Sequence, residues 1–189
     1  MNLIIDILGA LVIGSMLMLM MITFQYQLKD TADAAIFMTG MIDHMQKSTT
    51  KLNELISFAG IGMTPTTTIT TAGTTRLAFR TKWDYTTNTI SATIHTINLE
   101  LADSTAVGKS LLVKQDNVVL DKMSYIQWID QLGFRYFDID DHVTTTPASV
   151  RSIEYRITFR HHAPSVGAEP LHTRLQMRCY LMNAYLAGG

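Results

Sequence analysis

The sequence predicts an α+β fold, in which a long N-terminal α-helix, apolar and then amphipathic, packs on a C-terminal antiparallel β-sheet domain. Three observations predict it: an uncharged apolar run at residues 7–24, a helical spacing of apolar residues from 28 to 56, and a two-residue alternation from residue 77 onward. At 189 residues the chain has room for one domain and an appendage. The expected parts are a helix at 1–58, divided into 1–27 and 28–58, a Gly/Pro/Thr-rich linker at 59–75 and a globular domain at 76–189.

Composition narrows the classes of function. The chain carries 15 basic and 16 acidic side chains, a formal net charge of −1, so its overall charge gives no reason to bind nucleic acid. Cys179 is the only cysteine, which excludes an intrachain disulfide and a thiolate zinc cluster.

The first predicted element is an apolar helical segment. Residues 7–24 hold no charge and no proline, and their 18 residues reach the length of a membrane-spanning helix. Asp6 precedes this run; because an Asp at the bilayer centre costs about 2.5 to 3.5 kcal/mol, we expect it at an interface or beside a cationic partner. A cleaved secretory signal is the alternative, but no Lys or Arg precedes the run and no A-x-A site follows it.

The helix is expected to continue past the apolar run as an amphipathic segment. Apolar residues recur at seven-residue spacing, and polar residues fill the other face. The two series are Leu28, Ala35, Ile42 and Ile56, and Met38, Met45 and Leu52. Gly60, Gly62 and Pro65 predict that the helix ends near Phe58.

The rest of the chain is predicted to form strands. The Thr-rich residues 64–75 are interpreted as a solvated, extended connector. After them, alternation predicts strands at 77–85, at 89–101 with a bulge near His95, and in a hairpin at 111–120. Residues 123–132 fit a strand or a helical turn, and 134–139 are extended. The clearest strands are 151–160 and 171–181, and together the strands predict an antiparallel sheet that the second half of the helix covers.

No motif for catalysis or cofactor binding is present, since the sequence holds no GxSxG, HExxH, P-loop or GxGxxG frame. We therefore expect no enzyme, no catalytic residue, no cofactor and no metal. Cys179 is interpreted as a core residue, and adjacent His161 and His162 point to opposite faces of a strand. Asp138, Asp140 and Asp141 could offer oxygens to Ca²⁺, but they lack the Gly and distal Glu of an EF-hand loop, so loop solvation is the preferred interpretation.

Charge is distributed unevenly along the strand region. Residues 100–141 carry eight acidic and four basic side chains, whereas five arginines and two glutamates follow Val150. Oppositely charged patches of this kind can set the register between subunits, and ordinary surface decoration is the alternative.

The order of these segments resembles type IV pilins and secretion-system pseudopilins. The plan of an apolar N-terminal helix with one acidic residue near its start, an amphipathic continuation and then a sheet is similar to theirs. Three strands add detail, since they look like successive strands of the larger minor pilins and pseudopilins: GFRYFDIDD at 133–141, SVRSIEYRITFR at 149–160 and TRLQMRCYLMN at 173–183.

The resemblance implies a structural subunit of an extracellular type IV pilus-like filament that polymerises through its hydrophobic helix. Asp6 resembles in role the family's acidic residue that pairs with a neighbouring subunit's N-terminal amine. The implied partners are further copies of the chain, the inner membrane before assembly, and the pilus or secretion assembly machinery, with no nucleic acid and no small-molecule substrate. The implied location is the cell surface, after insertion in the membrane.

Physical reasoning supports the same expectation. A helix that is apolar on all sides needs lipid or protein around it, and identical neighbours in a head-to-tail array would supply it. Small residues let helices approach closely, so the predicted assembly residues are Asp6, Gly9, Ala10, Gly14 and Ser15. Two alternatives stay open: a bitopic membrane protein with an exterior sensing or binding β domain, and a minor tip or initiating pseudopilin of a secretion system.

Overall fold

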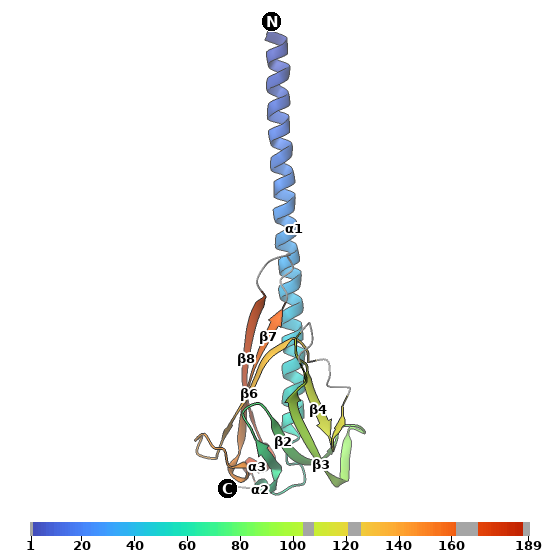
Figure 1. Ribbon diagram of the computed structural model, residues 1–189, viewed down its shortest axis with the longest axis vertical. Coiled ribbons are helices and arrows are strands. Elements are labelled where there is room, and N and C mark those ends of the chain that lie inside the picture. The colour runs from blue at the N-terminus through green and yellow to red at the C-terminus, as the bar shows by residue number, and fades with distance from the viewer. Residues whose placement is uncertain (1, 104–107, 121–125, 162–169, 187–189) are drawn as a thin grey trace. The chain divides into compact units, whose positions relative to one another are not determined.

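A computed structural model describes residues 2–103, 108–120, 126–161 and 170–186. Helices and antiparallel strands make up similar shares of the described residues, which confirms the predicted α+β class. The chain divides into two compact units, the first formed by residues 1–43 and the second beginning at His44. Figure 1 shows the order of the elements along the chain.

The first element, α1, runs from Asn2 to Ser57 without interruption. No proline occurs before Pro65, so no residue removes a backbone donor from the helix. The helix ends as predicted, because Gly60 and Gly62 adopt positive φ angles of 78° and 68°. That backbone suits glycine, and a Cβ at Gly60 would come within 2.7 Å of the Thr68 hydroxyl.

The buried face of α1 differs from the predicted heptad. In the second unit Ser48, Leu52, Leu55 and Ile56 are buried, which follows a three- or four-residue helical spacing. In the first unit Met38 and Ile42 are exposed, so those heptad positions are wrong as core residues. The predicted repeat therefore holds for Leu52 and Ile56, which lie in the core, and fails for its members before residue 44.

The residues predicted as a solvated connector take part in the fold. Pro65–Thr68 form one turn of helix, α2, and Ile69–Ala72 form β1. Ile69 is buried, and the backbone N–H of Gly60 donates to the carbonyl of Arg80 at 2.9 Å. The Thr-rich composition indicated exposure, which holds for Thr70 and Thr71 of β1, but Thr68 and Ile69 beside them are buried.

The first sheet has five antiparallel strands in the order β1-β2-β3-β4-β5. Its further strands are β2 (Leu77–Asp84), β3 (Thr89–Leu101), β4 (Leu111–Gln115) and β5 (Val118–Val119). The predicted hairpin is confirmed, and Asp116 and Asn117 turn it with positive φ angles of 50° and 70°. The irregularity in β3 lies between Ile90 and His95, just before the predicted bulge.

The second sheet has three antiparallel strands in the order β6-β7-β8. They are β6 (Ile129–Phe137), β7 (Ser152–His161) and β8 (Leu171–Tyr180), with a 3₁₀ turn, η2 (Pro147–Ser149), before β7 and a short helix, α3 (Met182–Leu186), after β8. The expectation of one sheet is therefore wrong. Within the described ranges, an isolated bridge joins Ile129 of β6 to Lys109, which lies two residues before the start of β4. A two-residue alternation of apolar and polar residues identifies a strand but not the strand it pairs with, which explains why one sheet was expected.

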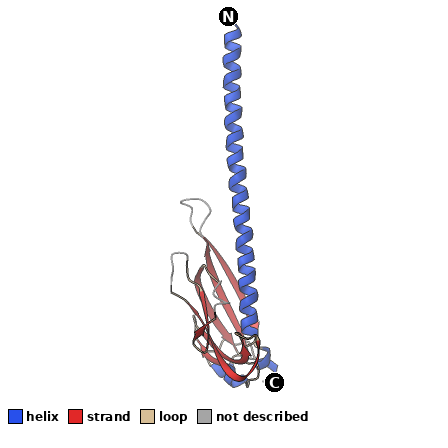
Figure 2. Cartoon of the chain, turned by 90° about the vertical axis from the view of Figure 1, so that its right-hand side faces the viewer, coloured by secondary structure: helices blue, strands red, loops and turns tan. Residues whose placement is uncertain are grey.

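One hydrophobic core joins the two sheets and the end of α1. Leu52, Leu55 and Ile56 belong to it, together with inward residues of both sheets such as Phe79 and Tyr155. Figure 2 shows the strands along one side of the last turns of α1. The second half of the amphipathic helix thus covers the sheets over its final turns, as predicted, but residues 28–43 do not belong to this core.

Candidate functional site

The most distinctive surface of the chain is the apolar segment of α1. Between Leu3 and Phe24 its large apolar side chains are 38% to 74% exposed. The helix contains a stretch that is long and apolar enough to cross a membrane, and none of that stretch is buried. Exposed apolar surface on this scale is rare in soluble monomers, so this segment requires lipid or other protein around it.

The smallest side chains of the segment point in three directions. Successive residues turn by about 100° around a helix, so Gly9, Gly14 and Ser15 lie about a third of a turn apart. Ala10 follows Asp6 by four residues, and Gly14 follows Ala10 by four, which places these three on one side. A Cβ added at Gly9 or Gly14 would meet nothing within 4 Å. The predicted assembly residues therefore do not form a single stripe.

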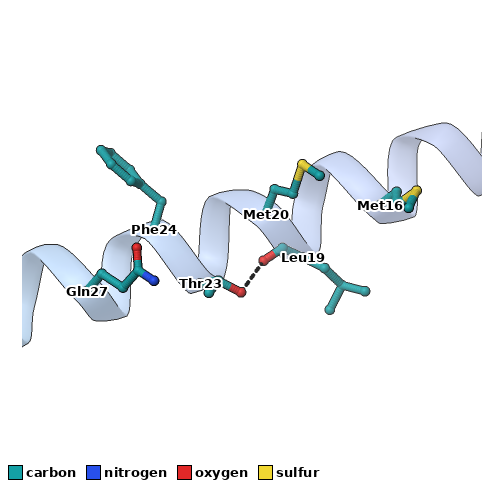
Figure 3. Close-up of a pocket in the computed structure, with 6 residues that line it drawn as sticks. All are labelled: Met16, Leu19, Met20, Thr23, Phe24 and Gln27. Carbon is teal, nitrogen blue, oxygen red and sulfur yellow. Dashed lines mark hydrogen bonds between the residues drawn. The ribbon is translucent and has the colours of Figure 1, made fainter.

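The hydroxyl groups on the exposed helix bond within the helix itself. Ser15 donates to the carbonyl of Val12 at 2.8 Å, and Thr23 donates to the carbonyl of Leu19 at 2.8 Å (Figure 3). Thr31 and Thr39 donate in the same way to carbonyls four residues earlier. Because these donors are already satisfied, the helix can enter an apolar environment without leaving hydroxyl groups unbonded.

Asp6 differs from those hydroxyl groups. Its side chain makes no hydrogen bond or ion pair with any residue in the described parts of the chain. An ionised carboxylate is costly to place in an apolar environment without a cationic or hydrogen-bonding partner. Asp6 is also the one charged side chain in the described part of the first 28 residues. In an apolar environment its carboxylate would therefore need a partner from outside this segment.

A shallow groove lies on the side of the helix that carries Gly9. Its six lining residues all come from α1 at three- and four-residue spacings: Met16, Leu19, Met20, Thr23, Phe24 and Gln27. Figure 3 shows Phe24 and Leu19 projecting from the helix with Thr23 between them. A groove formed by one helix cannot enclose a small molecule, but its ridges can receive the side chains of a second helix.

The groups that could carry chemistry lie in the second unit, and their partners are structural. Cys179 is half-buried, and its thiol donates to Oδ1 of Asn53 at 2.9 Å. Burial raises the pKa of this thiol to about 11, which keeps it protonated near neutral pH. Cys179 thus packs against the core from the inner side of β8, but it is not fully buried in it as the predicted core position required.

The described histidines do not gather at one site, although His44 and His161 lie close together. His95 Nδ1 lies 2.7 Å from Asp116, and His172 Nδ1 lies 3.8 Å from Asp130. His161 is buried near the ring of His44, with 6.4 Å between the centroids, and burial lowers its pKa. His162 lies outside the described residues, so the predicted opposition of His161 and His162 stays a prediction.

The acidic loop after β6 is organised by its own carboxylates. Oδ1 of Asp138 accepts the backbone N–H groups of Asp140 and His142, at 3.0 and 2.8 Å. Asp141 forms an ion pair with Arg178 on β8. Possible metal-ligand atoms of Asp138, Asp140 and His142 lie within 4.8 Å of one another. The backbone hydrogen bonds that Asp138 accepts already explain its position as that of a turn-forming residue, without a metal ion.

Comparisons with protein-family models, with curated proteins and with solved structures find no match to this chain. The class of the protein therefore comes from its architecture. A long apolar N-terminal helix followed by antiparallel sheets is a pilin-like layout, and it is also compatible with a bitopic membrane protein.

Two features of the site were not predicted from the sequence. The groove depends on which side chains of α1 flank one another, and a helical wheel could have indicated it. Asn53, which joins α1 to two strands of the second sheet, is a polar residue in a mostly polar stretch. No sequence signal separates it from its exposed neighbours.

Proposed function

We propose that the chain is a non-enzymatic structural subunit of an extracellular pilus-like filament, which polymerises by packing its apolar helix among those of other copies. The observation that carries this proposal is the exposure of the apolar side chains on every side of α1 between Leu3 and Phe24. Such a surface excludes a solitary state in water. Before assembly the same segment would lie in the membrane.

The positions of the small residues favour a bundle of several helices over an isolated span. A transmembrane pair packs along one stripe of small residues on each helix. Gly9, Gly14 and Ser15 instead open three sides of α1 to close approach, which suits a helix with several neighbours. Asp6 supports the same arrangement, since a carboxylate inside a helical bundle needs a partner from another chain.

The experiment compares filament yield and folding in the full chain. Replacement Asp6→Ala should abolish filaments in sheared cell-surface material, viewed by negative-stain microscopy. Asp30→Ala, an exposed Asp on the same helix beyond the apolar run, is the matched control and should assemble normally. Both variants should keep the near-ultraviolet circular dichroism of the wild type. Normal filament yield from Asp6→Ala would contradict the proposed role of Asp6.

A bitopic membrane protein with an exterior β domain is the second candidate. The same apolar exposure favours it, because one span of 18 or more apolar residues is sufficient for anchoring. This candidate predicts detergent-extracted monomers or dimers and no fibres on any cell that produces the chain. The wild-type micrographs therefore separate the two.

A further inference from the structure

The outward face of the second sheet is strongly basic. Strand alternation turns Ser152, Glu154, Arg156, Thr158 and Arg160 of β7 away from the core, while the residues between them are buried. The register places outward residues of β6 and β8 beside them, as in the pairs Arg135 with Glu154 and Glu154 with Arg178. The face carries five arginines: Arg135, Arg156, Arg160, Arg174 and Arg178.

The carboxylate of Glu154, at the centre of this face, interacts with several neighbouring side chains. Glu154 accepts from Nε of Arg156 at 3.0 Å and from the amide of Gln176 at 2.9 Å, and Arg135 lies 4.0 Å away. Its side chain is only 13% exposed. One carboxylate cannot balance the arginines around it, so the face keeps an excess of positive charge.

The two ends of the face differ in charge. At the Ser152 end, Asp141 pairs with Arg178, whose guanidinium also lies 4.2 Å from the ring centroid of Phe137. The loop at this end adds Asp138 and the exposed Asp140, and neither forms an ion pair within the described ranges. This end is therefore acidic beyond what Arg178 neutralises.

At the opposite end, Arg160 and Arg174 are exposed and form no ion pair with any described residue. Arg160 lies beside His172, which faces Asp130 at a distance of 3.8 Å. Eight residues of β7 separate Arg160 from Ser152, a length of about 26 Å. That distance is far beyond the reach of an ion pair, so the two ends cannot neutralise each other within one chain.

We propose that this face joins copies of the chain head to tail, with Asp140 of one copy against Arg174 of the next. The inference rests on the proposed function and deepens it. A translation along the strands brings the acidic end of one copy to the basic end of its neighbour, and repetition of that contact continues without closing. Charge complementarity of this kind fixes register and partner more than it adds affinity.

Cross-linking tests the contact directly. Asp140→Cys and Arg174→Cys are combined in the full chain with Cys179→Ser, and membranes and sheared material are treated with a mild oxidant. A ladder of disulfide-linked multimers is expected from the pair, and none from either single cysteine. Dimers alone would overturn the head-to-tail contact, because a two-fold contact closes after two copies. No cross-linking, with filaments still visible, would overturn this inference and leave the proposed function standing.

Charge exchange supplies the second arm. Arg174→Glu and Asp140→Lys should each lower filament or multimer yield by about tenfold, and the double variant should regain most of it. Arg80→Glu, an exposed arginine on β2, is the matched control and should have no such effect. Two results together would overturn the proposal: the double variant does not recover, and the chain binds a labelled DNA duplex whose binding is weakened by Arg174→Glu alone among these variants. The face would then be assigned to nucleic acid. A ladder in membranes without any filament would support the contact and contradict the proposed filament.

Discussion

The side-chain oxygen of Asn53, on α1, accepts a hydrogen bond from the hydroxyl of Tyr155, on β7, at 2.8 Å. The same oxygen accepts a hydrogen bond from the thiol of Cys179 on β8. The amide nitrogen of Asn53 lies 3.9 Å from the sulfur of Met177. One half-buried amide therefore joins the last turns of the helix to two strands of the second sheet. Hydrogen bonds have fixed directions, so this contact sets the rotation of the helix on the sheet in a way that apolar packing alone does not.

Replacement Asn53→Ala should lower the free energy of unfolding of the second unit by about 1 to 3 kcal/mol, because it leaves the hydroxyl of Tyr155 inside the protein without its acceptor. The measurement is urea unfolding of the micelle-solubilised full chain, followed by tryptophan fluorescence. Thr50→Ala, an exposed position on the same helix, should change stability by less than about 0.5 kcal/mol. Equal effects of the two variants would show that Asn53 has no special role.

The thiol of Cys179 should resist alkylation in the folded protein. Burial raises its pKa to about 11, so very little thiolate is present at pH 8, and the thiolate is the reactive form. Iodoacetamide labelling, followed by mass spectrometry, should be slow at pH 8 in buffer and fast in urea. Equal rates in the two conditions would contradict the buried environment of the thiol.

Acid should weaken the fold partly through Asp84. The Gln115 amide donates to this carboxylate at 2.7 Å and, with hydrogen bonds from Thr86 and Thr87, lowers its pKa to about 2 against the opposing effect of burial. Because the folded pKa lies below the unfolded value of about 3.9, the stabilisation is fully present above pH 4 and is lost as the pH falls toward 2. Asp84→Asn should flatten this part of the pH dependence in urea unfolding. Asp103→Asn, at an exposed position, is the control and should keep the wild-type profile.

Large side chains at Gly9, Gly14 or Ser15 should each reduce filament yield, because they would block the approach of neighbouring helices. The β domain should stay folded, because a side chain at either glycine meets nothing within the chain itself. If several neighbours surround α1, replacements on all three sides are harmful, whereas a dimer would be sensitive to one side only. Gly9→Leu, Gly14→Leu and Ser15→Leu are compared with Val12→Leu by counting filaments in sheared material. Tolerance of two of the three replacements would contradict the several-neighbour arrangement.

Much of the fold was predictable from local patterns. The lack of proline and the glycines at 60 and 62 predicted where α1 ends, and alternation located β2, β7 and β8 almost to the residue. These signals are local, because a helix or strand repeats its environment every few residues. The division into two sheets was missed, since the pairing of strands depends on contacts between distant parts of the chain.

The candidate site shows the same limit. Apolar composition predicted the exposed segment and Asp6 within it, but the separation of Gly9, Gly14 and Ser15 onto three sides follows only from helical geometry. The basic face is a further example. Five arginines are visible in the sequence, yet their gathering on one surface opposite the loop at Asp140 requires the register of three strands.

The hydroxyl groups of α1 that bond back to their own helix have a mechanical consequence. In the proposed filament, Ser15 and Thr23 have no free proton to offer a neighbouring helix, so beyond the contact made by Asp6 shape and dispersion forces would hold the central helices together. Contacts of that kind have no fixed direction, so they can form again after one helix slips lengthwise past another by about one turn. A fibre built on them would stretch under tension by sliding, and the charged contacts between its outer domains would limit how far it extends.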